Sequence, residues 1–261
     1  MNRYYIIILL LTFEMFMHAQ ELLNIKDLDT CKVFSSMEEA LKVPEKVFVL
    51  DLSANNLKTV PIEIIKLKNL QVLNLANNSI TELPLEIFEL KHLQILNLEE
   101  NRLKNLPDSI SKLKNLYNLN LTRTKIPAIP ESFSELKNLR ILNLSWNQLK
   151  DDSIKPIFKL IQLQDLNLMR NQIEFLDSSI CEMNELLYLN LNFNPLKKLP
   201  DNFGNLQQLI ELDLGKNTEL KSLPESFKKL INLEYLNLES VPLSYQEKKK
   251  LPKLDEDVIE Y

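Results

Sequence analysis

Leucine and isoleucine recur along this chain in a pattern that returns every 23 or 24 residues. In the segment "NLQVLNLANNSITELP" at 69–84, Leu73 and Leu75 alternate with their neighbours as the residues of a short strand do. One such segment cannot bury its own leucines, so we expect successive copies to stack and to share one core. Nine copies of L-x-x-L-x-L-x-x-N-x-L begin at Val47, Leu70, Leu93, Leu116, Leu139, Leu163, Leu186, Leu209 and Leu233.

An asparagine follows nearly every predicted strand, at the point where the chain must turn. The turn leaves backbone N–H and C=O groups without partners inside the stack, and a side-chain amide can donate to one and accept from another. We therefore predict that these asparagines are structural and form a ladder of hydrogen bonds. Thr124 and Val241 replace asparagine in the fourth and ninth copies. The predicted ladder consists of Asn55, Asn78, Asn101, Asn147, Asn171, Asn194 and Asn217.

The second half of each copy carries another pattern, L-P-x-x-I-x-x-L-x-N-L, as in "LPDSISKLKNL" at 106–116 and "IPESFSELKNL" at 129–139. With both patterns, residues 47–243 resemble the leucine-rich repeat family, in particular its exported bacterial members with 23-residue repeats. The resemblance implies an α/β solenoid shaped as a horseshoe or arc, with a parallel β-sheet on the concave face and short helical turns on the convex face. It also implies that a partner protein is held on the concave face, with no catalysis and no cofactor.

Each end of such a stack needs a cap, because the outermost repeat has a neighbour on one side only. Residues 20–46 form the predicted amino-terminal cap, with a short helix that begins at Ser36 in a capping box and ends before Pro44. Residues 244–261 form the predicted carboxy-terminal cap and tail, with a short helix near 244–251. Within the fifth repeat, we expect Pro156 to break the helical turn.

The first 19 residues have the features of a signal peptide. Arg3 precedes an apolar run from Ile6 to Phe13, and Ala19 is a small residue near a cleavage point. The run is too short to cross a hydrocarbon layer of about 30 Å. We predict cleavage after Ala19, which leaves a mature chain without a membrane span; the alternative is an uncleaved anchor. With a signal peptide, the protein is expected to be secreted or in the cell envelope. If the segment is only an apolar amino terminus, the protein is expected to be cytoplasmic.

Composition excludes several kinds of partner and cofactor. The net charge is −5, from 31 basic and 36 acidic residues, so the chain has no general attraction for nucleic acid or for an anionic membrane. The two glycines, Gly204 and Gly215, are too few for a loop that cradles a phosphate.

Residues able to perform nucleophilic or metal chemistry are also scarce. The stacking of repeats places His92 about 19 Å from Cys181, too far for a nucleophile and its base. The same spacing separates Cys31 from Cys181 by about 24 Å, so we predict two free thiols. No His and Cys residues have the spacing of a metal site.

Function must then depend on the exposed side chains of the strands and the turns that follow them. The row that includes Asn74, Asn97 and Asn143 is nearly uniform, and we interpret it as amides that bond along the sheet. The rows beside it vary, and an exposed Trp and Phe between arginines are typical of an interface hot spot. The predicted partner-binding residues on the concave face are Arg123, Trp146, Arg170, Tyr188, Phe193, Lys216 and Tyr235.

Two alternatives remain open for these surfaces. Trp146 and Phe193 shield the asparagine ladder from water if they pack over the turns. The apolar residues at the other end of the sheet form a second binding patch, or they are present only because they favour β-strands. These residues are Val49, Val72 and Ile95.

We therefore predict a noncatalytic, monomeric, exported module that binds a protein partner of unknown identity. The alternative is an intracellular scaffold or signalling protein with the same repeats. An enzyme is disfavoured because only the two caps lie outside the repeats, and neither is large enough for an active-site domain.

Overall fold

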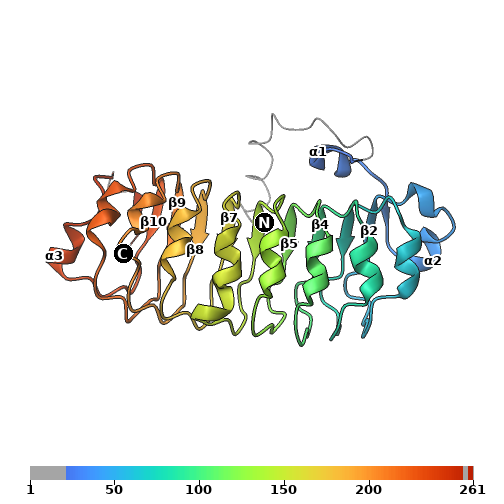
Figure 1. Cartoon of the computed structure of the whole chain (residues 1–261), viewed down its shortest axis with the longest axis horizontal. Coiled ribbons are helices and arrows are strands. Elements are labelled where there is room, and N and C mark those ends of the chain that lie inside the picture. The colour runs from blue at the N-terminus through green and yellow to red at the C-terminus, as the bar shows by residue number, and fades with distance from the viewer. Residues whose placement is uncertain (1–21, 255–257, 261) are drawn as a thin grey trace.

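The structure is a computed structural model that describes residues 22–254 and 258–260. In this part of the chain, 11 strands form a parallel sheet, and their order in space is their order along the chain. Figure 1 shows the elongated stack, with the strands along one side and the helical turns along the other. The strands are β1 (Val33–Phe34), β2 (Val49–Asp51), β3 (Val72–Asn74), β4 (Ile95–Asn97), β5 (Asn118–Asn120), β6 (Ile141–Asn143), β7 (Asp165–Asn167), β8 (Tyr188–Asn190), β9 (Glu211–Asp213), β10 (Tyr235–Asn237) and β11 (Ile259–Glu260).

The register of the sheet follows the repeat. Leu73 of β3 pairs with Leu96 of β4, and both side chains are fully buried. The residues on either side of the central leucine in these strands are half-buried and face away from the core. We call this outward side the sheet face. The predicted fold class, a leucine-rich repeat solenoid, is confirmed.

Short 3-10 helices pack side by side opposite the strands. Most begin after a proline whose carbonyl accepts the first turn bond, as in Phe133 N–H to Pro130 O at 3.0 Å. Proline suits this place because its φ is fixed near the helical value and the position needs no N–H donor. The 3-10 helices are η3 (Pro44–Lys46), η4 (Ile62–Lys66), η5 (Leu85–Glu89), η6 (Asp108–Lys112), η7 (Glu131–Glu135), η8 (Asp151–Lys159), η9 (Ser178–Glu182), η10 (Phe203–Asn205) and η11 (Glu225–Lys229).

Pro156 does not break the helical turn of the fifth repeat, so that prediction was wrong. Helix η8 runs from Asp151 to Lys159 with Pro156 buried inside it. The fixed φ of proline, near −65°, lies within the range of a 3-10 helix, so the ring is compatible with this conformation.

Caps cover both ends of the described stack. At the amino-terminal end, α2 (Met37–Ala40) begins at Ser36, whose side chain accepts from the Glu39 N–H, and α1 (Ile25–Leu28) precedes it. At the other end, α3 (Tyr245–Lys248) lies where the sequence predicts a helix, and β11 adds a last strand beside β10. The predicted signal peptide, residues 1–19, lies outside the described residues.

The asparagines that follow the strands are tied to the backbone of two successive coils. Asn147 Nδ2 donates to the carbonyl of Leu144 in its own coil, at 2.9 Å, and to that of Leu121 in the coil before, at 2.8 Å. Asn78 bonds in the same way, and its Oδ1 accepts from Leu57 N–H at 2.8 Å. The exposed side chain of Asn55 donates within its own turn, to Ser53 O at 3.0 Å, and its backbone N–H donates to Asn78 Oδ1 of the next coil at 3.1 Å.

A second ladder, which the sequence analysis missed, joins the coils on the return side. Asn115 donates to Lys91 O at 2.7 Å, and Asn138 to Lys114 O at 2.8 Å, each 24 residues earlier. His92 occupies the same position, with Nδ1 3.0 Å from Lys68 O. The signal was the asparagine of the L-x-N-L motif, so His92 is half-buried in this ladder and not an ordinary exposed loop residue.

Candidate functional site

Five of the predicted binding residues occupy equivalent turns just past the strands. Each immediately precedes a ladder asparagine, or Thr124 in the fourth coil, and has a positive φ, between 53° and 59°. Where an asparagine follows, its side chain braces this turn: Asn147, for example, donates to both Leu144 O and Ser145 O. We call these five residues the rim: Arg123, Trp146, Arg170, Phe193 and Lys216.

The structure thus separates the seven predicted residues into two groups. Tyr188 and Tyr235 begin strands β8 and β10 and lie on the sheet face itself. The rim residues lie just beyond the carboxy-terminal ends of the strands, along the side of the sheet where these ends are aligned, and not on the sheet face. A partner that contacts both groups must therefore reach from the sheet face to its edge.

Four rim residues from successive coils form a stack of alternating cations and aromatic rings. The guanidinium carbon of Arg123 is 4.4 Å from the centroid of the Trp146 ring. Arg170 lies between two rings, at 3.9 Å from the centroid of Trp146 and 4.1 Å from that of Phe193. Trp146 and Phe193 remain 38% and 40% exposed, so the rings contact the arginines without being sealed from solvent.

The three cations of the rim differ in their ionic partners. Arg123 forms an ion pair with Glu100 at 2.5 Å, and Lys216 forms one with Glu239. Arg170 forms no ion pair with any residue that the structure describes, and its buried Nε atom has no hydrogen-bond acceptor. The charge of Arg170 is therefore not neutralised within the described chain.

Acidic and tyrosine side chains alternate along the sheet face of strands β7 to β10. Asp165, Tyr188, Glu211 and Tyr235 are aligned by the strand register. Burial, and then the charge of Glu211, raises the pKa of Asp165 to about 7. Burial also raises the pKa of Glu211, with a further contribution from Glu234. In the described structure neither Asp165 nor Glu211 has a cationic partner, so this row attracts positive charge.

The uniform asparagine row has another role than the one predicted. Its oxygens mainly accept from the backbone N–H two residues later, as in Ser145 N–H to Asn143 Oδ1 at 3.0 Å and Ala76 N–H to Asn74 Oδ1 at 3.1 Å. This is the local turn that Asn and Asp favour. The row therefore ends the strands and prepares the turns of the rim, and only a few of its members bond along the sheet.

The apolar end of the sheet face lies close to another part of the same chain. Leu23 N–H donates to Gln71 Oε1 at 3.0 Å, and Gln94 Nε2 donates to Leu23 O at 2.9 Å. The two glutamines directly precede β3 and β4, and Figure 1 shows α1 near this end of the sheet. A segment of the amino-terminal cap is thus held where the sequence suggested a second patch around Val72 and Ile95.

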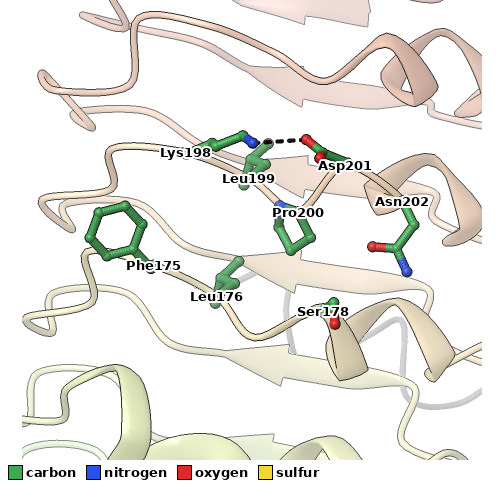
Figure 2. A pocket seen from close by; sticks show the side chains of 8 residues that line it. All are labelled: Phe175, Leu176, Ser178, Lys198, Leu199, Pro200, Asp201 and Asn202. Carbon is green, nitrogen blue, oxygen red and sulfur yellow. Dashed lines mark ion pairs between the residues drawn. The ribbon is translucent and has the colours of Figure 1, made fainter.

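A shallow hollow lies on the flank between the sixth and seventh repeats. Figure 2 shows its lining residues, with Phe175 at one side and the ion pair between Lys198 and Asp201, 2.9 Å long, at the other. Phe175 is 47% exposed and is held by Asp151, whose carboxylate accepts from the Phe175 N–H. Because Lys198 is paired with Asp201, the hollow offers a mixed apolar and polar surface without an unpaired charge among its lining residues.

Groups for catalysis or metal binding do not converge in the described structure. Cys31 and Cys181 are both free thiols, as the repeat spacing predicts. No group of three or more His, Cys, Asp or Glu side chains among the described residues is arranged to hold a metal ion. Among the helices described, none is long and apolar enough to cross a bilayer.

Comparison with known protein families gives two overlapping matches. A model described as "Leucine-rich repeat region" matches residues 30–139 and 128–256. A curated relative, the "Probable disease resistance protein At1g15890" of Arabidopsis thaliana, is 43% identical over 56 residues, which cover 20% of this chain and 7% of that protein.

Solved structures share the same architecture. Internalin C2 of Listeria monocytogenes is 27% identical with a TM-score of 0.64, over 75% of this chain and 82% of its own. The plant peptide hormone receptor RGFR1, solved in complex with RGF2, is 25% identical with a TM-score of 0.62, over 76% of this chain and 33% of its own. The ectodomain of the receptor kinase GASSHO1/SCHENGEN3 of Arabidopsis thaliana, solved with CASPARIAN STRIP INTEGRITY FACTOR 2, is 30% identical with a TM-score of 0.59, over 74% and 27% of the two chains. This chain therefore corresponds to about a third or less of the two plant receptor chains.

Proposed function

The chain belongs to the leucine-rich repeat family, and from this premise we propose that it is a noncatalytic module that binds a partner protein. The observation that carries the proposal is the exposed stack of Arg123, Trp146, Arg170 and Phe193 along one edge of the sheet. Aromatic and arginine side chains provide large contact areas and oriented donors, and they dominate the binding energy of many interfaces. Two of the solved neighbours are plant receptors in complex with a named ligand, which agrees with a binding role for such a scaffold.

The binding surface that we propose joins the rim to the acidic row of the sheet face. The rim supplies aromatic rings and one unpaired cation, and the row of Asp165, Tyr188 and Glu211 supplies unpaired acids. Charge of both signs at fixed positions selects for a partner with the complementary pattern and disfavours others. The partner class is a protein, because the surface is extended and shallow and does not enclose a small molecule.

The test is capture of proteins from the exterior of the source cells by crosslinking, followed by mass spectrometry. Wild-type protein is compared with a Trp146→Ala, Arg170→Ala double variant and with Ile231→Ala, a matched loss of an apolar side chain that is 68% exposed. We expect the double variant to lose the partner and the control to retain it. A partner that is captured equally by all three proteins would exclude the rim as the binding site.

The same variants distinguish binding from shielding of the ladder. If Trp146 only protects the asparagine ladder, the double variant loses folding stability together with binding. If the rim is a binding site, binding weakens by more than about 2 kcal/mol while the free energy of unfolding changes by less than about 1 kcal/mol.

We also propose that the protein is exported, on the basis of the basic and apolar pattern of residues 1–19. Amino-terminal sequencing of the protein from cell fractions tests this. A chain that begins at Gln20 outside the cytosol supports export. An intact Met1 in the cytosol supports the intracellular scaffold instead.

A further inference from the structure

Arg170 differs from Arg123, the other arginine of the stack, in two ways. It forms no ion pair with a described residue, and its guanidinium group is held between two aromatic rings. The ring of Trp146 on one side and that of Phe193 on the other restrict the guanidinium to one plane. A guanidinium carries five N–H donors in that plane, and stacking on its two faces does not occupy them. In the described structure the Arg170 side chain bonds to no acceptor, and its Nε atom is buried without one.

A buried donor without an acceptor is unfavourable, and native proteins rarely keep one without a reason. The neighbouring coils show the usual arrangement, since Arg123 is paired with Glu100 and Lys216 with Glu239. At the corresponding distance from Arg170 the described chain has no acid. No residue of the described chain supplies an acceptor to Arg170, so solvent or a bound partner must supply it.

Because that site lies within the surface proposed for partner binding, we propose that Arg170 receives the carboxylate of an Asp or Glu side chain of the bound protein. Trp146 and Phe193 hold the guanidinium for two parallel hydrogen bonds to the carboxylate. This inference rests on the proposed function and specifies the chemistry of the partner.

The local charge favours a carboxylate over a doubly charged phosphate. Arg123 and Lys216 are already neutralised, so the rim presents one net positive charge near Arg170. On the sheet face, the pKa values of Asp165 and Glu211 are raised, first by burial and then by neighbouring acids, so negative charge is already disfavoured there. A single carboxylate matches the single free cation.

The chain provides its own probe for this site, because Trp146 is the only tryptophan. We would titrate the full protein with acetylated, amidated hexaglutamate and follow tryptophan emission. Hexaglutamine with the same blocked ends is the neutral control. We expect hexaglutamate to change the emission in a saturable way and hexaglutamine to leave it unchanged.

Three variants then assign the effect to the guanidinium. Arg170→Gln should weaken hexaglutamate binding by about tenfold or more, and Arg170→Lys, which keeps the charge but not the planar fork, should give an intermediate loss. Arg102→Gln is the matched control, since Arg102 is an exposed arginine three coils away, about 14 Å by strand spacing. Unfolding curves of each variant verify that the fold is retained.

Two results of the titration would overturn the proposal. One is hexaglutamate binding that Arg170→Gln leaves unchanged. The other is equally tight binding of acetylated hexaglycine with a free carboxyl end, which would assign the site to a chain terminus and not to an acidic side chain. Capture of the partner by the Arg170→Gln variant, together with its loss in Trp146→Ala, would reject this inference and leave the proposed function intact.

Discussion

The backbone of Gly204 lies against that of Ser226 in the next coil so closely that a Cβ on residue 204 would be 1.8 Å from the Ser226 carbonyl oxygen. The Gly204 N–H also donates to Ser226 Oγ at 3.0 Å, so the two coils are both packed and bonded at this point. Just beside it, Phe203 stacks on Phe227 with a distance of 6.1 Å between ring centroids. Helix η10 can therefore pack this closely on η11 only because residue 204 is a glycine, which has no Cβ atom.

We expect Gly204→Ala to lower the free energy of unfolding by about 1–3 kcal/mol, because the contact is with backbone that cannot move aside cheaply. Gly215→Ala is the matched control, since its Cβ would meet only side-chain amides, 2.8 Å away, of Asn192 and Asn237. Denaturant unfolding followed by circular dichroism measures both. An equal effect of the two substitutions would contradict the packing argument.

The ladder asparagines should differ in importance according to their burial. Asn147→Leu removes one of the two side-chain donors to each of the carbonyls of Leu121 and Leu144, since Thr124 and Asn171 supply the others, and we expect a loss of about 1–3 kcal/mol in the free energy of unfolding. Asn55→Leu should cost less than half as much, because Asn55 is exposed and water can replace its bond to Ser53. If both variants unfold at the same denaturant concentration, the ladder does not stabilise the stack as we infer.

The raised pKa of Asp165 predicts that part of the free energy of unfolding depends on pH, and that Asp165→Asn removes this dependence. An Asp with a pKa of about 7 in the folded chain and about 4 when unfolded binds its proton more tightly when folded. Its contribution to stability is complete below pH 4 and is lost as the pH rises to about 7. Asp165→Asn should therefore stabilise the protein at pH 8 relative to wild type, by on the order of 1–3 kcal/mol after solvent screening, and less at pH 5.

Unfolding curves at pH 5 and pH 8 check this difference. Asp152→Asn is the control, because Asp152 is exposed and paired with Lys155 at 2.8 Å. No gain at pH 8 would show that Asp165 is charged in the folded protein without penalty, and the same gain at both pH values would show that the gain does not come from its ionisation.

The two cysteines should react at very different rates in the native protein. Burial, together with the charges of Glu182 and Asp177, raises the pKa of the Cys181 thiol to about 12, and its side chain is 3% exposed. Cys31 is only partly buried, in the amino-terminal cap. Iodoacetamide at pH 8 followed by mass spectrometry should modify Cys31 first and Cys181 only after denaturation. Equal modification of both in the native state would indicate that the sixth coil opens readily.

The repeat pattern was enough to predict the coils, their register and most of the core. The period of 23 or 24 residues identifies which leucines stack, as Leu73 on Leu96 shows, because every coil must repeat the same geometry to share a core. It also identified Arg123, Trp146, Arg170 and Phe193 as neighbours in one row. Even the capping of α2 by Ser36 followed from local spacing.

The contacts that these neighbours make could not be predicted from the repeat pattern and are visible only in the folded chain. The positive φ of the turns directs the rim side chains past the end of the sheet, which places them side by side at its edge. Whether Arg170 forms an ion pair depends on which side chains of the adjacent coils point toward it. Arg123 and Lys216 each form an ion pair with a glutamate, and Arg170 forms none with a described residue. The bond from Tyr235 to Glu260 and the two bonds that hold Leu23 also join segments outside the repeat to the sheet. A repeat fixes backbone positions from its period, but the direction of each side chain and the contacts of non-repeated segments arise only when the whole chain is folded.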